Sequence, residues 1–274
     1  MKHPQFSVVI PALNEELFLP RLLASLTAQT CQDFDVTVVD GSSKDKTVAC
    51  ARSFEKSLPH FQIIVSKKAS LPLQRNLGAR ASRGQWICFL DADGELTPFF
   101  MERVKQFIES HDCRLMTTWF KPDSENPKDA VYTLFWNIVL EASLIFKRPL
   151  PPGPLTVVRR DAYEHVGGYD ETHAFHEDVD FGLRLSKMNV RLDVLRESLC
   201  VWSFRRFRKQ GTLKVINQYI LSILPVLFFN TSLKSMPGYI MGGHPYATPK
   251  KKFKKSAFRR LNAAVTKFMK DLIE

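Results

Sequence analysis

Acidic and polar residues stand at the ends of three short apolar runs. The first run leads into Pro11-Ala12-Leu13-Asn14-Glu15, the second into Asp40-Gly41-Ser42-Ser43, and a later one into Asp91-Ala92-Asp93. If the runs are parallel strands, their carboxyl ends share one edge of a sheet, which is where ligands bind in such folds. The three segments together therefore predict one acidic ligand site.

Each segment alone also has a structural explanation. Asn14 and Ser43 are acceptable helix N-caps, and Asp40 is a common turn residue. For any single residue, neither the structural nor the functional explanation is favoured. The common position of all three segments after a strand favours the ligand site.

Asp91 and Asp93 carry the most specific chemistry. In an extended segment, residues two apart point to the same side, so both carboxylates can face one point. Neighbouring carboxylates repel each other unless a cation or hydrogen-bond donors compensate them. Mg²⁺ suits this arrangement, because it binds through one or two carboxylates together with substrate phosphates. The chain has neither a G-x-x-x-x-G-K-[ST] loop nor a strand-linked G-x-G-x-x-G motif, which disfavours ATPase and dinucleotide-binding functions.

The elements that must position these residues alternate between strands and helices up to about residue 120. Uninterrupted apolar runs predict buried strands, and apolar residues at helical spacing predict the helices between them. We therefore expect an α/β fold with a mainly parallel central sheet flanked by helices. The expected strands are Ser7–Ile10, Val36–Val39, Ile63–Val65 and Trp86–Leu90, and the expected helices are residues 19–26, a helix from Thr47, and Gln74–Ser82.

Residues 150–205 form a second, mixed part of the same predicted domain. A proline-rich loop around Gly153 precedes an expected strand at Leu155–Val158, and Asp178 is expected to open a helix that runs to Lys187. Beyond Trp202 the composition changes to basic clusters around an apolar stretch. We therefore expect one domain over residues 1–210 and a helical appendage over residues 211–274.

Several short motifs follow one another in a fixed order along residues 6–211. The early motifs are Ser7-Val8-Val9-Ile10-Pro11-x-x-Asn14-Glu15, Val38-Val39-Asp40-Gly41-Ser42-Ser43-x-Asp45-x-Thr47, Arg75-Asn76-x-Gly78 and Phe89-Leu90-Asp91-Ala92-Asp93. The later motifs are Gly167-Gly168-Tyr169-Asp170, His176-Glu177-Asp178 and Ser203-Phe204-Arg205-Arg206-Phe207. This ordered series, which is far more specific than any one motif, resembles the family 2 glycosyltransferases.

The resemblance implies the nucleotide-diphospho-sugar transferase fold known as GT-A, an inverting mechanism, and Mg²⁺ or Mn²⁺ as the cofactor. It implies a nucleotide-diphosphate sugar as donor and a glycan or a lipid-linked molecule as acceptor. Ser203 stands where some relatives have a histidine near the metal, so the implied metal ligands are Asp91 and Asp93 alone. The other implied roles are Pro11, Asn14, Glu15 and Asp40 around the base and ribose, Arg75 near the base or diphosphate, Asp91 also at the ribose, and Asp178 as the catalytic base.

In the implied reaction, an acceptor hydroxyl attacks the anomeric carbon from the face opposite the leaving nucleoside diphosphate. This single displacement inverts the carbon and needs one base. An alternative role for Asp178 is that of a helix N-cap. Arg205 and Arg206 either add positive charge near the diphosphate or form a solvated basic cluster, and His173 and His176 either contact the acceptor or are simply exposed.

Three other functions compete with this interpretation. A polyprenyl-phosphate glycosyl synthase would use a similar donor but a lipid phosphate as acceptor. A nucleotidyltransferase would share the architecture, but the chain has no glycine-rich N-terminal loop for it. A non-catalytic sugar-binding or nucleic-acid-binding module would have no need of Asp91, Asp93 and Asp178 together.

The positive charge of the chain is concentrated near its C-terminus. Of the formal net charge of +11, residues 250–274 carry +7, so the other 249 residues are nearly balanced. A nucleic-acid-binding surface over the whole chain is therefore disfavoured, and we expect no nucleic-acid partner. Five cysteines without C-x-x-C spacing predict neither a disulfide framework nor a zinc site, and no signal peptide precedes the first apolar run, so we expect a cytoplasmic protein.

Two apolar stretches and a basic segment raise the question of membrane contact. Val131–Phe146 has a broad apolar face at helical spacing, which most often forms core, and Ile220–Phe229 is denser but interrupted by Pro225. Residues 250–272 put apolar residues on one face of a basic helix, an arrangement that can lie on an anionic membrane. The alternative is a surface helix docked on the domain. We expect peripheral contact with the cytoplasmic face of a membrane through residues 211–274.

Overall fold

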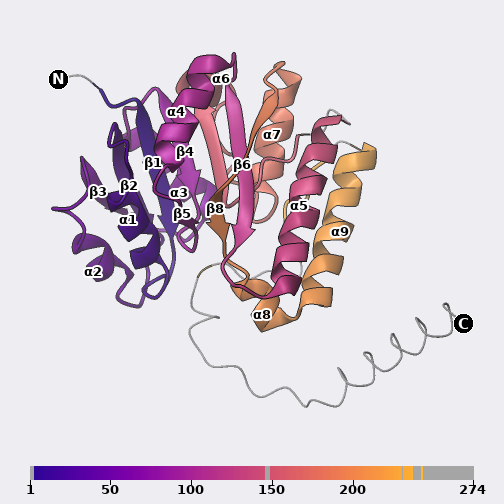
Figure 1. Cartoon of the computed structure of the whole chain (residues 1–274), viewed down its shortest axis with the longest axis horizontal. Coiled ribbons are helices and arrows are strands. Elements are labelled where there is room, and N and C mark those ends of the chain that lie inside the picture. Colours follow the sequence, from indigo (N-terminus) through magenta and orange to yellow (C-terminus); the bar gives the residue numbers. More distant parts are fainter. Residues whose placement is uncertain (1–2, 146–148, 230, 237–241, 243–274) are drawn as a thin grey trace, which may run out of the picture.

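A computed structural model describes residues 3–145, 149–229, 231–236 and 242. Within these residues, one eight-stranded sheet in the order β3-β2-β1-β4-β7-β6-β8-β5 has helices against both faces (Figure 1). The predicted α/β class with a mainly parallel central sheet is confirmed. The strands are β1 (Phe6–Ala12), β2 (Phe34–Asp40), β3 (Phe61–Val65), β4 (Trp86–Leu90), β5 (Glu95–Leu96), β6 (Leu115–Pro122), β7 (Leu155–Arg159) and β8 (Leu192–Trp202).

The direction of the strands changes in the second half of the sheet. Strands β3, β2, β1 and β4 are parallel, whereas β7 lies antiparallel between β4 and β6. Strand β8 pairs parallel with β6, and the short β5 pairs antiparallel with β8. The helices are α1 (Leu19–Thr27), α2 (Thr47–Arg52), α3 (Leu71–Ala81), α4 (Phe100–Ser110), α5 (Pro127–Ile145), α6 (Arg160–His165), α7 (Glu177–Lys187), α8 (Arg205–Gln210) and α9 (Thr212–Phe229).

The central strands are buried because side chains on both of their faces enter a core. Side chains alternate along a strand, so Val8 and Ile10 of β1 pack with the leucines of α1, while Val9 packs on the opposite side with α3, α6 and α7. Burial on both faces explains why these strands appear in the sequence as uninterrupted apolar runs.

The register of β1 and β2 brings their carboxyl ends together. Ala12 lies opposite Asp40 in the parallel ladder. The side chain of Gln74 in α3 donates hydrogen bonds to the carbonyl oxygens of Ala12 and Val39, at 2.9 and 2.7 Å. At Gly78 a Cβ atom would lie 2.3 Å from Cγ1 of Val9, so a glycine is needed for α3 to pack this closely on β1. Helix α3 therefore holds the two strand ends in place.

Helix α5 corrects the prediction that the apolar face of Val131–Phe146 forms core. Its buried side chains include Thr133, Asn137 and Ser143, whereas Leu134 and Ile138 are each 57% exposed. The amide of Asn137 donates to the carbonyl of Phe120 and accepts from its N–H, both at 3.1 Å. These two hydrogen bonds hold the polar side of α5 against β6 and leave most of the apolar side facing outward.

The described part of the predicted appendage includes α9, which continues through Pro225, and residues 231–236 and 242. The side chains of Ile220, Leu221 and Leu224 on this helix are exposed. In the described ranges, no helix combines the length and the apolar character needed to cross a membrane. Residues 243–274, which include the predicted basic amphipathic helix, lie outside the described residues. The domain boundary near residue 210 stays a prediction.

Candidate active site

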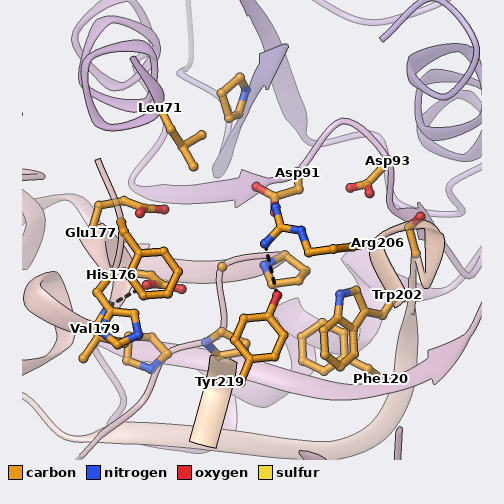
Figure 2. A pocket seen from close by; sticks show the side chains of 18 of the residues that line it. Leu71, Asp91, Asp93, Phe120, His176, Glu177, Val179, Trp202, Arg206 and Tyr219 are labelled. Atoms are coloured by element: carbon orange, nitrogen blue, oxygen red, sulfur yellow. Dashed lines mark hydrogen bonds between the residues drawn. The ribbon is translucent and has the colours of Figure 1, made fainter. Parts of the chain in front are cut away.

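A pocket of about 300 Å³ opens at the carboxyl edge of the sheet. Five of the predicted site residues line it together, although they are far apart in the sequence. Figure 2 shows Asp91 and Asp93 on one side of this pocket, with Glu177 and Val179 of α7 on another. The five predicted residues that line the pocket are Pro11, Glu15, Asp91, Asp93 and Asp178.

Asn14 and Asp40 do not line this pocket but join the loops beside it. Asn14 accepts a hydrogen bond from the N–H of Lys44 and donates its own N–H to Ser43 Oγ, both at 2.8 Å. Asp40 Oδ2 accepts from the N–H of Ser43 at 2.9 Å, which is the turn role considered for it. Asp40 Oδ1 is buried without a hydrogen-bond partner among the described residues.

The N-cap explanation for Asn14 and Ser43 is wrong. Phe18 stands at the N-cap of α1, and Lys46 stands at the N-cap of α2. Asn14 instead has a φ of 53°, in the left-handed region that asparagine tolerates better than most residues. Its side chain and backbone are thereby free to bond the β2–α2 loop.

Arg75 lies beneath the pocket and connects three of its walls. The guanidinium, 1% exposed, donates to Glu177 Oε1 at 2.9 Å, to Asp91 Oδ1 at 3.1 Å and to the carbonyl of Gly153 at 3.0 Å. Burial raises the pKa of Asp91 to about 6, and it also raises the pKa values of Glu177 and Asp178. The positive charge of Arg75 lowers the pKa of all three carboxyls. One buried cation thus compensates a group of carboxyls that burial alone would neutralise.

Glu177 is a residue that the sequence interpretation missed. Its position next to Asp178 in the His176-Glu177-Asp178 motif was a usable signal, because two adjacent acids at a buried helix start need a compensating cation. The spacing of the motifs could not identify Arg75 as that cation, since the two residues are 102 positions apart.

Arg205 pairs with carboxylates on the other side of the pocket. It donates to both oxygens of Glu15, at 2.6 and 2.7 Å, and its Nε lies 2.8 Å from Asp93 Oδ2. Burial raises the pKa of Glu15 to about 7, although Arg205 lowers it. Arg205 is only 13% exposed, so the alternative of a solvated basic cluster is wrong for this residue. Arg206 donates to the hydroxyl of Tyr219 at 3.2 Å.

Asp178 is the second residue of α7 and not its N-cap, so the N-cap explanation is wrong for this residue too. His176 stands at the N-cap with a φ of 56°, and Asp178 Oδ1 accepts the N–H of Val179 at 2.8 Å. A Cβ at Gly153 would lie 3.0 Å from Asp178 Oδ2. The absence of a side chain at Gly153 therefore allows the loop after α5 to pass close to this carboxylate.

The two predicted metal ligands offer oxygen atoms in the same pocket. The negative charges of Asp91 and Asp93 raise the pKa of Glu15. Arg75 lies beside Asp91, and Arg205 lies beside Asp93. Ser203 Oγ, in the pocket wall, is buried without a hydrogen-bond partner among the described residues. Carboxylates, a hydroxyl and a surplus of negative charge fit a hard divalent ion.

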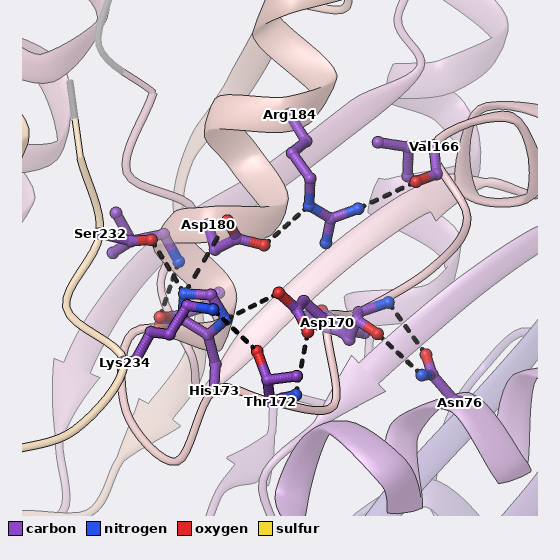
Figure 3. Close-up of polar contacts among 12 residues, drawn as sticks. Asn76, Val166, Asp170, Thr172, His173, Asp180, Arg184, Ser232 and Lys234 are labelled. Atoms are coloured by element: carbon purple, nitrogen blue, oxygen red, sulfur yellow. Dashed lines mark hydrogen bonds and ion pairs between the residues drawn. The ribbon is translucent and has the colours of Figure 1, made fainter.

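A separate group of Asp170, His173 and Asp180 also has the composition of a metal site. Nδ1 of His173 lies 3.2 Å from Asp170, whereas Nε2 lies 3.9 Å from Asp180 and 3.1 Å from Ser232 Oγ (Figure 3). The two carboxylates lie beside opposite nitrogens of the ring, although one ligand atom of each of the three residues lies within 4.8 Å of the others. The group joins residues 231–236 to the domain, where Ala174 N–H donates to the carbonyl of Lys234 at 2.8 Å.

The two predicted histidines differ in position. His173 is 4% exposed, so the alternative of a merely exposed loop histidine is wrong. His176 lines the pocket, and burial lowers its pKa to about 4. His176 is therefore neutral near pH 7.

Comparison with known proteins identifies the fold and the family. The family model for glycosyl transferase family 2 matches residues 7–167, a span that contains the acidic segments but ends before Asp178. A PGL/p-HBAD biosynthesis glycosyltransferase of Mycobacterium bovis is 31% identical over 67% of this chain and 70% of its own length. The chain spans only 61% of the length of other curated relatives.

Solved structures with GT-A folds are similar over most of the chain. S. aureus TarS 1-349 in complex with UDP-GlcNAc is 18% identical, with a TM-score of 0.63 over 83% of this chain and 73% of that one. The mannosyltransferase PcManGT from Pyrobaculum calidifontis, in complex with GDP-Man and Mn²⁺, is 18% identical, with a TM-score of 0.61 over 83% and 69%. With its GT-A fold and a family model that matches more than half of its length, the chain belongs to glycosyl transferase family 2.

Proposed function

We propose that the chain transfers a sugar from a nucleotide-diphosphate donor to an acceptor hydroxyl, with inversion and with a divalent metal. The observation that carries this proposal is that Asp91, Asp93 and Asp178 line one pocket at the carboxyl edge of the sheet. The named ligands of the similar structures, UDP-GlcNAc for TarS and GDP-Man with Mn²⁺ for PcManGT, support the same class of donor.

The donor binds on the side of the pocket formed by β1 and β4. Pro11 and Glu15 contact the base and ribose, and Asp40 supports the neighbouring loop by accepting the N–H of Ser43. Asp91 and Asp93 hold Mg²⁺ or Mn²⁺. When bound, this ion supplies electrostatic stabilisation to the departing diphosphate. Arg205 already lies beside Asp93 and adds positive charge at the same place.

Asp178 acts as the general base for the acceptor hydroxyl. Burial raises its pKa, and a more basic carboxylate accepts a proton more readily from an alcohol. Arg75 holds Glu177 and Asp91 and so keeps the first turn of α7 in place beside the donor site. Even with a raised pKa, a carboxylate is a weak base toward an alcohol. The acceptor hydroxyl therefore gives its proton to Asp178 late in the displacement, when positive character has developed on the sugar.

A hydroxyl acceptor fits this site better than the lipid phosphate of a polyprenyl-phosphate glycosyl synthase. A phosphate is already ionised and needs no base, and it would be repelled by buried carboxylates such as Glu177 and Asp178. A non-catalytic binding module would gain nothing from a buried base beside two metal ligands.

We also propose that the chain contacts the cytoplasmic face of a membrane through residues 211–274, with a lipid-linked or cell-envelope acceptor. The exposed Ile220, Leu221 and Leu224 of α9 and the basic sequence of residues 250–274 support this location.

The test is release of nucleoside diphosphate from UDP-, GDP- and dTDP-sugars, with Mg²⁺, Mn²⁺ or EDTA. We expect release with one donor, strict dependence on the ion, and a product whose anomeric configuration, measured by NMR, is opposite to that of the donor. Retention of configuration would overturn the inverting mechanism, and binding of none of these nucleotides would overturn the proposed donor.

A further inference from the structure

One part of the pocket has mostly aromatic walls. Five elements from two separate parts of the sequence contribute to it, namely β6 with α5, and β8 with α8 and α9. Helices α5 and α9 lie side by side (Figure 1). We call this part of the pocket the aromatic chamber. Its defining residues are Phe120 of β6, Trp136 and Val139 of α5, Trp202 of β8, Phe207 of α8, and Tyr219 and Ile223 of α9.

The aromatic rings support one another in edge-on contacts. The ring centroid of Trp136 lies 5.4 Å from that of Tyr219, at an interplanar angle of 87°. It lies 6.4 Å from the ring centroid of Trp202, at an interplanar angle of 76°. Trp202 lies 5.8 Å from Phe207 at 87°. Such pairs are favourable beyond the area that they bury, so the walls of the chamber are formed before any ligand enters.

The chamber opens directly onto the reacting groups. Figure 2 shows Phe120, Trp202 and Tyr219 together on the side away from Asp91 and Asp93, with Arg206 between the two sets. The hydrogen bond from Arg206 to the Tyr219 hydroxyl marks this border. A molecule in the chamber would therefore present one end to the donor sugar.

The chamber offers few hydrogen bonds to a ligand. The Tyr219 hydroxyl accepts from Arg206, and the Ser222 hydroxyl donates to the Tyr219 carbonyl at 2.8 Å. The indole N–H of Trp136 is buried and has no partner among the described residues, so it is a donor that one ligand oxygen could satisfy. A sugar ring with several hydroxyls would lose hydrogen bonds to water here without replacement.

We propose that the aromatic chamber is the acceptor subsite and that it binds an apolar group, aryl or alkyl, attached close to the hydroxyl that receives the sugar. This inference rests on the proposed function and names the chemical class of its acceptor. Burial of the apolar group supplies the binding free energy, and the group places its hydroxyl at the border with the donor site. Simple glycans, which lack such a group, do not occupy the chamber.

The test uses tryptophan fluorescence, because Trp136 and Trp202 line the chamber. Octyl β-D-glucoside below its micellar concentration and phenyl β-D-glucoside are compared with free glucose, which has the same sugar ring, with a hydroxyl in place of the apolar group. We expect saturable changes in emission with the glucosides and none with glucose. Tighter binding of the octyl compound assigns an alkyl acceptor, and tighter binding of the phenyl compound assigns an aryl one.

Two valines of the same helix provide a matched pair of variants. Val139→Asn places an amide in the chamber wall, and Val131→Asn makes the same change at a side chain that is 64% exposed and outside the pocket. We expect Val139→Asn to weaken glucoside binding by about tenfold, because the amide must be desolvated, and Val131→Asn to change nothing. Ile223→Asn serves as a second chamber variant if Val139→Asn fails to fold.

Binding of UDP and GDP with Mn²⁺, measured by calorimetry on the same proteins, separates this inference from the proposed function. If the nucleotide binds but the glucosides do not, the aromatic chamber is not the acceptor subsite, and the donor assignment stands. If no nucleotide binds, the proposed function itself fails. Glucoside binding that is equal in wild type, Val139→Asn and Ile223→Asn would also overturn the inference, because the probes would then bind elsewhere.

Discussion

Arg75 and Glu177, which are 102 positions apart, form a buried ion pair with an N–O distance of 2.9 Å. The same guanidinium donates to Asp91, so a single side chain of α3 joins the end of β4 to the start of α7. The candidate metal ligand and the candidate base therefore depend on one buried cation for their relative position.

Removal of that cation should destabilise the protein. In Arg75→Met, Glu177 and Asp91 lose their partner in a buried site, and we expect the free energy of unfolding to fall by roughly 3–5 kcal/mol. Arg80→Met is the matched control, because Arg80 belongs to the same helix but is 60% exposed. Its guanidinium is as far as 3.9 Å from the nearest oxygen of Glu171, so this ion pair is weak. Urea unfolding measures both variants. An equal, small effect in the two would show that the buried pair contributes little.

Asp178→Asn should lower kcat strongly without loss of donor binding. The amide cannot accept the proton of the acceptor, and general-base catalysis contributes about 10²–10⁴-fold, so we expect kcat to fall within that range while donor affinity is retained. Asp161→Asn, an exposed carboxyl of α6 outside the pocket, is the control. Steady-state kinetics and calorimetric donor binding are the measurements. Normal turnover in Asp178→Asn would reject the base assignment.

Asp93→Ala should remove metal binding. Loss of partners that merely support metal ligands lowers affinity by about 10–100-fold, so we expect loss of a ligand to weaken Mn²⁺ binding at least as strongly. Electron paramagnetic resonance measures free and bound Mn²⁺ directly. Glu95→Ala changes an exposed acid two positions further along and should bind Mn²⁺ as the wild type does. Unchanged binding in Asp93→Ala would move the metal site elsewhere.

The pH dependence of turnover should have its acid limb above the ordinary range of an aspartate. Burial raises the pKa of Asp178 above 3.8, and only the ionised carboxylate can accept a proton. kcat should therefore fall as the pH is lowered, with a midpoint above pH 3.8, at saturating donor and metal. A kcat that stays constant down to pH 4, with the protein still folded by circular dichroism, would contradict this assignment.

Membrane contact should depend on the exposed residues of α9 and on salt. Leu221 is 63% exposed, and Leu221→Asp should lower the fraction of protein that sediments with anionic vesicles. Phe99→Asp, which changes a side chain 55% exposed ahead of α4, should leave that fraction unchanged. High salt should release the wild type, because the basic charges are then screened. Recovery of the wild type in the supernatant at low salt would end the membrane proposal.

The strands and the acidic segments could be predicted because their signals are local. β4 spans Trp86–Leu90 as expected, since a strand buried on both faces must be apolar throughout. Asp91 and Asp93 follow it directly, so the parallel sheet itself carries them to the edge where Pro11 and Glu15 also lie. Strand direction and chain order suffice for this part of the site.

Periodicity could not tell which side of α5 is buried. A helical repeat of apolar residues has the same spacing whether it faces a core or solvent, and here the hydrogen bonds of Asn137 to the backbone of Phe120 place the polar side inward. The outward position of Leu134 and Ile138 therefore depends on a contact across 17 positions of the sequence.

The sequence alone predicted β1 to β4, β7, the family and the acidic residues at the strand ends, but not β5, β6, β8 or the antiparallel pairs. Only the tertiary structure decided that Arg75 pairs with Glu177, that Arg205 lies against Glu15 and Asp93, and that aromatic residues from five elements enclose one chamber. The reason is physical: strand and helix signals arise between near neighbours, whereas these contacts join residues that only the packing of the helices on the sheet brings together.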